Sequence, residues 1–204
     1  MLNVRKIRSS DDPFFEKAMA IYEAAFPANQ RHPMATIKER LDNGQYFMFL
    51  GQLEGEPALM ALFWPLKGAK FVLFDYMAVA EKFQGQGIGK EFVTQVPDLL
   101  GTDLPLVLEV EAEGHGESPA RRVKFHKGMG ARTLKGVRYM LPPLSAPGAT
   151  EMTLMVMNWK EDSIPGLIVK RLIRCIYKEL YSRGSRDSLL RTFIDKVPED
   201  VKLV

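Results

Sequence analysis

The sequence has few of the residues that build disulfides, metal centres and membrane spans. Its one cysteine, Cys175, excludes an intrachain disulfide, and its three histidines are scattered rather than grouped as metal ligands. No run of 18 apolar residues is present, and the first ten residues, MLNVRKIRSS, lack the apolar stretch of a signal peptide. We therefore expect a cytoplasmic protein that binds no metal.

A strong excess of charge is also missing. The formal net charge is only +3, which is too small to indicate nucleic-acid binding by itself. Apolar residues make up 46% of the 204 residues, enough for one well-buried core. We expect one domain, residues 1–160, followed by a helical extension, residues 161–204.

Strand-like and helix-like stretches alternate along the chain, which predicts an α/β fold of the α+β kind with a mixed sheet. A helix joins the strands expected at 70–80 and 105–113, so these two strands should be parallel. The other expected elements are a strand at 3–8, helices at 13–26, 34–41, 88–96 and 118–130, a hairpin within 46–66, and closing strands within 135–144 and 149–159.

The segment 165–184 has the pattern of an amphipathic helix. Lys170, Arg174 and Lys178 are spaced four apart, opposite an apolar side. Such a helix can bind RNA or an anionic membrane, but packing of its apolar side on the domain or on a partner subunit is the favoured interpretation. The residues after 184 are expected to form a loose tail.

One segment, EKFQGQGIGKEF at 81–92, combines three glycines with the start of a helix. It does not fit a Walker loop, because Gln84 stands where the first glycine belongs and Glu91 stands where a hydroxyl should hold magnesium. It does not fit the dinucleotide pattern either, because Lys90 takes the place of the third glycine. The remaining pattern is Q-x-x-G-x-G, in which Gly87 and Gly89 follow Gln84.

The order of a strand, this loop and a helix suits anion binding for two physical reasons. Glycines let the backbone turn sharply and bring N–H groups close to an anion. The first amides of the following helix lack internal partners and lie at the positive end of the helix dipole. The pattern predicts a pyrophosphate site without magnesium, and the alternative is a glycine turn kept for steric reasons alone.

Three stretches resemble the GNAT family of acetyltransferases. YMAVAEKFQGQGIGKEF at 76–92 is similar to the family's acetyl-CoA-binding motif, and LEV at 108–110 is similar to the fifth strand of members that acetylate peptide α-amines. FHKGMGA at 125–131 resembles the helix end where members carry a tyrosine. The resemblance covers roughly residues 3–159.

The resemblance implies a GNAT-like acyl-CoA N-acyltransferase fold with an added C-terminal helix. It also implies that an acetyl group moves from acetyl-CoA to a primary amine by direct attack. The alternative is a non-catalytic acyl-CoA-binding sensor or regulatory module on the same fold.

The family also indicates which residues hold coenzyme A. Backbone groups at the end of the strand would bond the pantetheine arm, and amides of the loop would hold the pyrophosphate. The residues concerned are Met77, Ala78 and Val79 on the strand, and Gln84, Gly85, Gln86, Gly87, Ile88, Gly89 and Lys90 in the loop.

Transfer to an amine needs a base to take the amine proton. Glu109, Glu111 and Glu113 alternate along one strand and so face the same side. Neighbouring carboxylates repel, which raises at least one pKa towards neutrality and attracts a cationic amine. The resemblance places the base at Glu109, with Glu111 next. The alternative is a solvated face or a salt bridge with a nearby arginine.

Three further residues are candidates. Asp75 interrupts an apolar strand and is either a second base or a structural hydrogen-bonding group. His126 stands where the family has the tyrosine that protonates the thiolate, although a helix histidine is more often an exposed polar residue. Tyr139 could substitute for it as the acid.

Arg31 lies in the segment that covers the acceptor site in the family. It is expected to recognise a carboxylate or phosphate on the substrate, or else to be a surface charge. The expected partner is a small-molecule or peptide amine, and the family resemblance leaves a homodimer open. No strong signal for nucleic acid or a membrane is present.

Overall fold

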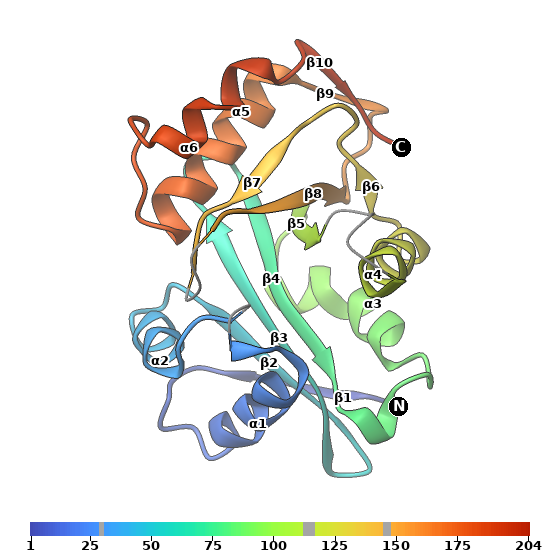
Figure 1. The fold of residues 1–204 in the computed structure, drawn as a ribbon. Coiled ribbons are helices and arrows are strands. Elements are labelled where there is room, and N and C mark those ends of the chain that lie inside the picture. Colours follow the sequence, from blue (N-terminus) through green and yellow to red (C-terminus); the bar gives the residue numbers. More distant parts are fainter. Residues whose placement is uncertain (29–30, 112–116, 145–147) are drawn as a thin grey trace. The chain divides into compact units, whose positions relative to one another are not determined.

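The computed structural model describes residues 1–28, 31–111, 117–144 and 148–204, and Figure 1 shows its elements. Contacts divide the chain into two compact units. The first is made mainly of Met1–Trp64 and Phe74–Asp103. The second is made of Pro65–Leu73, Leu104–Pro143 and the C-terminal residues up to Val204.

The first unit contains four neighbouring strands. β1 (Asn3–Ile7) pairs antiparallel with β2 (Phe47–Leu53), which pairs antiparallel with β3 (Glu56–Leu66). The last strand, β4 (Phe71–Val79), lies beside β3. Gly55, with φ of 83°, turns the chain between β2 and β3, which confirms the predicted hairpin.

The described residues of the first unit form three α-helices and the short 3-10 helix η2 (Glu81–Phe83). The α-helices are α1 (Phe15–Ala25), α2 (Met34–Asp42) and α3 (Ile88–Leu100). α1 buries apolar residues at helical spacing, and its Tyr22 ring meets the ring of Tyr76 on β4 edge-on, with centroids 4.9 Å apart. From α3, Phe92 is fully buried, with its ring centroid 6.3 Å from that of Phe63 on β3.

α3 runs four residues beyond the predicted end at 96. Pro97 lies inside the helix, where its lack of an N–H group removes one internal hydrogen bond without ending the helix. Gly101, with φ of 63°, ends it, and the Gly101 N–H bonds to the carbonyl of Pro97 at 2.9 Å.

The second unit is organised around β5 (Leu106–Glu111) and β8 (Thr150–Met157), which pair antiparallel. β5 is parallel to the first residues of β4, with Val72 opposite Leu106, so the predicted parallel pair is confirmed. The unit also contains α4 (Glu117–Gly128), β6 (Arg132–Thr133) and β7 (Tyr139–Leu141). Both short strands pair with β8.

The C-terminal segment consists of several short elements. They are β9 (Ser163–Pro165), α5 (Gly166–Cys175), a π-turn η3 (Ile176–Leu180), α6 (Ser188–Arg191), a 3-10 turn η4 (Ile194–Lys196) and β10 (Asp200–Lys202). Figure 1 shows α5 and α6 beside β7, and the Tyr177 hydroxyl of η3 donates to the carbonyl of Met140 on β7. The mixed α/β fold with an added C-terminal helix is confirmed.

The expectation of a loose tail after residue 184 is wrong. β10 pairs antiparallel with β9, and Val201 is fully buried. The Val204 carbonyl also accepts from the Thr133 N–H at 2.7 Å. The buried apolar residues of this stretch are spaced as on one face of a helix, at i, i+3, i+4, i+7 and i+11, a pattern that the sequence analysis did not use; they are Leu190, Phe193, Ile194, Val197 and Val201.

α5 separates its apolar and basic sides as the pattern predicts. Val169, Leu172 and Ile173 are fully buried, whereas Arg171 and Arg174 are exposed. The apolar side therefore packs inside the second unit. Among the described residues, no helix combines the length and apolar character needed to cross a membrane.

The close packing of the C-terminal strand predicts a sensitivity at Gly166. A Cβ at this position would lie 2.0 Å from the carbonyl oxygen of Pro198, so Gly166→Ala must shift backbone. We expect the variant to lose about 1–3 kcal/mol of unfolding free energy in urea titrations. Gly184→Ala is the control, because no atom lies within 4 Å of its Cβ position and its stability should change by less than about 0.5 kcal/mol. Equal stability of the two variants would contradict the packing.

Candidate active site

The glycine loop of the first unit has the geometry that its sequence predicts. Gly85 and Gly87 have φ of 76° and 79°, in the left-handed region where other residues are strained. No atom lies within 4 Å of the Cβ position of either glycine, so crowding by neighbours does not explain them. The backbone turn requires the glycines, and the space beside the turn is open.

The loop leads directly into the N-terminus of α3. Gly87 is the N-cap residue, and no side chain caps the helix. The side-chain amides of Gln84 and Gln86 instead donate to the carbonyls of Val79 and Lys82, both at 3.1 Å. The first N–H groups of α3 thus form a positive helix end on an exposed loop, which is suited to bind an anion.

The strand before the loop offers a second set of backbone groups. The ladder between β4 and β5 joins only Val72 with Leu106 and Leu73 with Val107. From Met77 to Val79, the edge of β4 away from β3 forms no ladder among the residues that the structure describes. An unpaired edge of this kind can bond an extended ligand in the manner of an added strand. Met77, Ala78 and Val79 lie on this stretch.

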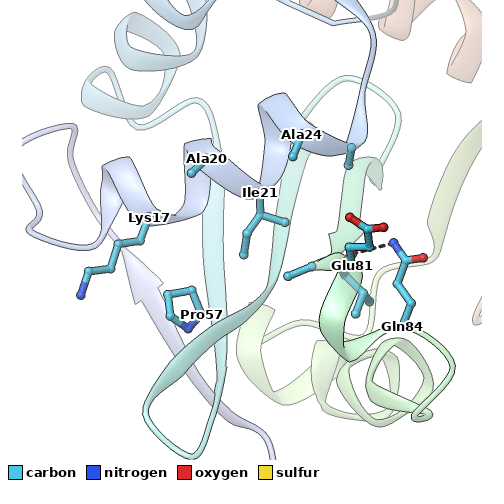
Figure 2. A pocket seen from close by; sticks show the side chains of 10 residues that line it. Lys17, Ala20, Ile21, Ala24, Pro57, Glu81 and Gln84 are labelled. Carbon is cyan, nitrogen blue, oxygen red and sulfur yellow. Dashed lines mark hydrogen bonds between the residues drawn. The ribbon is translucent and has the colours of Figure 1, made fainter.

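A pocket of about 680 Å³ adjoins the loop within the first unit. Figure 2 shows α1 along one side of it, with Glu81 and Gln84 on another. Most of the lining is apolar, and Lys17 and Glu81 are its charged residues. Two of the lining residues, Val79 and Gln84, are among those predicted to hold coenzyme A.

Asp75 belongs to a hydrogen-bonded chain in the first unit. The Tyr46 hydroxyl donates to the Asp75 carboxylate, and Arg40 donates to the Tyr46 hydroxyl at 3.1 Å. Burial raises the pKa of Asp75 to about 6, against the lowering effects of the Tyr46 hydrogen bond and the charge of Arg40. The hydrogen bond from Tyr46 fits the structural alternative that was expected for Asp75.

Glu109 is the centre of a cluster in the second unit. It lies half-buried on β5, and each of its carboxylate oxygens accepts from a tyrosine. Tyr139 of β7 donates to Oε1, and Tyr181, one residue after η3, donates to Oε2 at 2.8 Å. The structure thus brings together two residues that the sequence singled out, Glu109 and Tyr139, and adds Tyr181, which the sequence analysis missed.

The other glutamates of β5 have different surroundings. Glu111 forms an ion pair with Arg122 of α4, which is the salt-bridge alternative considered from the sequence. Glu113 lies outside the described residues. Of the three, Glu109 is held by uncharged donors, whereas a cation already neutralises Glu111.

His126 on α4 is half-buried. Burial and the charge of Arg122 lower its pKa to about 4, so the ring is neutral at pH 7. Its Nδ1 is buried without a hydrogen-bond partner. A neutral imidazole has no imidazolium proton to give to a thiolate, so this environment does not support the predicted acid role.

Arg31 holds the end of α1. Its guanidinium donates to the carbonyls of Glu23 and Phe26 at 2.9 and 3.3 Å and lies 3.4 Å from the Glu23 carboxylate. This placement suits the C-terminal end of a helix, where a cation is favourable. Recognition of an acceptor by Arg31 stays a prediction. In the part of the chain that the structure describes, no three His, Cys, Asp or Glu residues gather as metal ligands.

Comparison with known proteins supports one family. The model of the acetyltransferase (GNAT) family matches residues 15–116, half of the chain. A search of curated proteins gives no match.

Solved structures share the fold. A GNAT-family acetyltransferase from Bacteroides thetaiotaomicron has 19% identity and a TM-score of 0.75, covering 88% of this chain and 98% of its own. The ribosomal-protein-S18-alanine N-acetyltransferase of Escherichia coli has 19% identity and a TM-score of 0.56, with 77% and 93% covered. A GNAT acetyltransferase from Elizabethkingia anophelis, solved with acetyl-CoA bound, has 16% identity and a TM-score of 0.54, with 76% and 97% covered. Together with the family model, these findings show that the chain belongs to the GNAT family of acetyl-CoA-dependent acetyltransferases.

Proposed function

We propose that this protein is an N-acetyltransferase that carries the acetyl group from acetyl-CoA to a primary amine by direct attack. The observation that carries the proposal is the open glycine loop before the uncapped N-terminus of α3. The amides from Gln84 to Lys90 hold the pyrophosphate there, and the unpaired edge of β4 at Met77, Ala78 and Val79 bonds the pantetheine arm.

Glu109 is the general base of the proposed reaction. The amine nitrogen bonds to the acetyl carbonyl carbon, the carbon–sulfur bond breaks, and the CoA thiolate leaves. The amine must lose a proton, which Glu109 takes directly or through one water. Two tyrosine hydroxyls stabilise the ionised carboxylate, which is the form a base requires, whereas the carboxylate of Glu111 is paired with Arg122.

The proposal assigns no acid to the thiolate. His126 is neutral at pH 7, and Tyr139 is fully buried with its hydroxyl on Glu109. Asp75, the other candidate base, serves the structure of the first unit through Tyr46 and Arg40.

The second candidate is a non-catalytic acyl-CoA-binding module, which the neutral His126 at the family's tyrosine position favours. A turnover assay distinguishes the two candidate functions. A panel of an alanine-terminated peptide, a lysine peptide, spermidine and an aminoglycoside is mixed with acetyl-CoA, and released thiol is measured. Thiol release with any amine supports the transferase. Tight acetyl-CoA binding without release supports the module.

The loop proposal predicts that bulk at Gly87 blocks the cofactor. Gly87→Trp should weaken acetyl-CoA binding by about 100-fold in calorimetric titration, because the side chain covers the amides that bond the pyrophosphate. Gly44→Trp is a matched control, since Gly44 also has a positive φ, of 67°, and open space around it. Its affinity should stay within about threefold of the wild type. Equal affinities for the two variants would place the cofactor elsewhere.

The base proposal predicts different effects at two neighbouring glutamates. Glu109→Gln should lower kcat by about 100-fold to 10,000-fold with the responding amine, because the amide cannot take the proton. Acetyl-CoA affinity should not change. Glu111→Gln should keep kcat within about tenfold of the wild type, because its carboxylate is paired with Arg122. The reverse order of effects would move the base to Glu111.

The raised pKa of Asp75 predicts a pH-dependent cost to stability. The folded protein holds the Asp75 proton more tightly than the unfolded chain does. Protonated Asp75 therefore adds to the free energy of unfolding below about pH 4, and this contribution is lost as the pH rises through about 6. Asp75→Asn keeps an acceptor for Tyr46 without the charge. In urea titrations, the unfolding free energy of the variant should therefore increase relative to that of the wild type between pH 4 and 7, by about 2 kcal/mol at pH 7. A difference that does not change with pH would contradict the assignment.

A further inference from the structure

Tyr181 joins the C-terminal segment to Glu109. Its hydroxyl donates to Oε2 at 2.8 Å across 72 positions of sequence, while Tyr139 donates to Oε1. The two donors come from different elements, so the carboxylate is held from both of its oxygens.

The position of the Tyr181 ring is fixed by its surroundings. Its ring meets the Tyr177 ring edge-on, with centroids 6.2 Å apart, and Tyr177 is fully buried. The Tyr177 carbonyl accepts from the Arg183 N–H at 2.8 Å, so the backbone after η3 folds back on the helix end. Because the ring is already held in place, its hydrogen bond to Glu109 costs the Tyr181 side chain little further rotamer entropy.

The two tyrosines differ in burial. Tyr139 is fully buried, whereas Tyr181 and Glu109 are partly exposed. Of the two donors, Tyr181 therefore lies on the accessible part of the cluster. A carboxylate bonded at one oxygen can still rotate about its last torsion, which has a broad energy profile, and a second donor restricts that rotation.

We propose that Tyr181 is a positioning residue for Glu109. With Tyr139 it fixes both carboxylate oxygens, so that Glu109 receives the amine proton in one orientation and in its ionised form. The inference rests on the proposed role of Glu109 as the base. It gives the C-terminal segment a role in holding the proposed base within the second unit.

The test uses the full chain and four variants: Tyr181→Phe, Tyr22→Phe, Glu109→Gln and the double variant Glu109→Gln/Tyr181→Phe. Thiol release from acetyl-CoA is measured against pH with the best amine of the panel, and acetyl-CoA affinity by calorimetry. Tyr22→Phe is the matched control, because it also loses a hydroxyl hydrogen bond, but one to the backbone carbonyl of His32 in the first unit.

Tyr181→Phe should lower kcat about tenfold, leave acetyl-CoA affinity unchanged and move the acidic limb of the pH profile to higher pH. The double variant should be no slower than Glu109→Gln, because Tyr181 acts through Glu109. Tyr22→Phe should keep the wild-type profile. A Tyr181→Phe enzyme with wild-type kcat and pH profile, beside an inactive Glu109→Gln, would overturn the inference alone. An active Glu109→Gln would overturn the proposed base.

A second measurement needs no acceptor. With ¹³C-labelled tyrosine, the Cζ signals of Tyr139 and Tyr181 are assigned from the Phe variants and followed by NMR against pH. Both should shift with one common midpoint, and that transition should vanish in Glu109→Gln. A Tyr181 signal that does not change with pH, or that shifts equally in Glu109→Gln, would overturn the contact.

Discussion

A carboxylate within an apolar strand needs hydrogen-bond donors. In the second unit, two separate elements supply donors to Glu109. Val107, two positions away on the same face of β5, is fully buried, so the Glu109 side chain leaves the strand beside an apolar group. The donors are Tyr139 from β7 and Tyr181 from the C-terminal segment. The pairing of β7 with β8 and the packing of η3 place these two hydroxyls.

Glu109 and Asp75 show how surroundings give two carboxylates different roles. Both interrupt apolar strands, and both accept from tyrosine hydroxyls. Asp75 has Arg40 behind its tyrosine, and burial still raises its pKa to about 6. Glu109 accepts from Tyr139 and Tyr181 and sits half-exposed in the cluster that we assign to proton transfer.

The C-terminal segment contributes both to the packing of the second unit and to the hydrogen bonds of the proposed base. Phe193 and Val201 of this segment are buried, and β10 pairs with β9. That packing supports the end of α5 and η3, where Tyr177 and Tyr181 lie. A segment that resembles an appendage in the sequence thus supplies a donor to the proposed base.

The sequence by itself determined the features that depend on local backbone preference. The positive φ of Gly85 and Gly87 can be read from residue type, and so can the hairpin at Gly55 and the apolar side of α5. The family motif at 76–92 also lies within one continuous stretch. Only the tertiary structure decided which donors meet Glu109, that His126 is neutral, and that the last residues pair with β9. These features arise from contacts and burial between segments far apart in the chain, such as the 72 positions between Glu109 and Tyr181, and no local pattern records them.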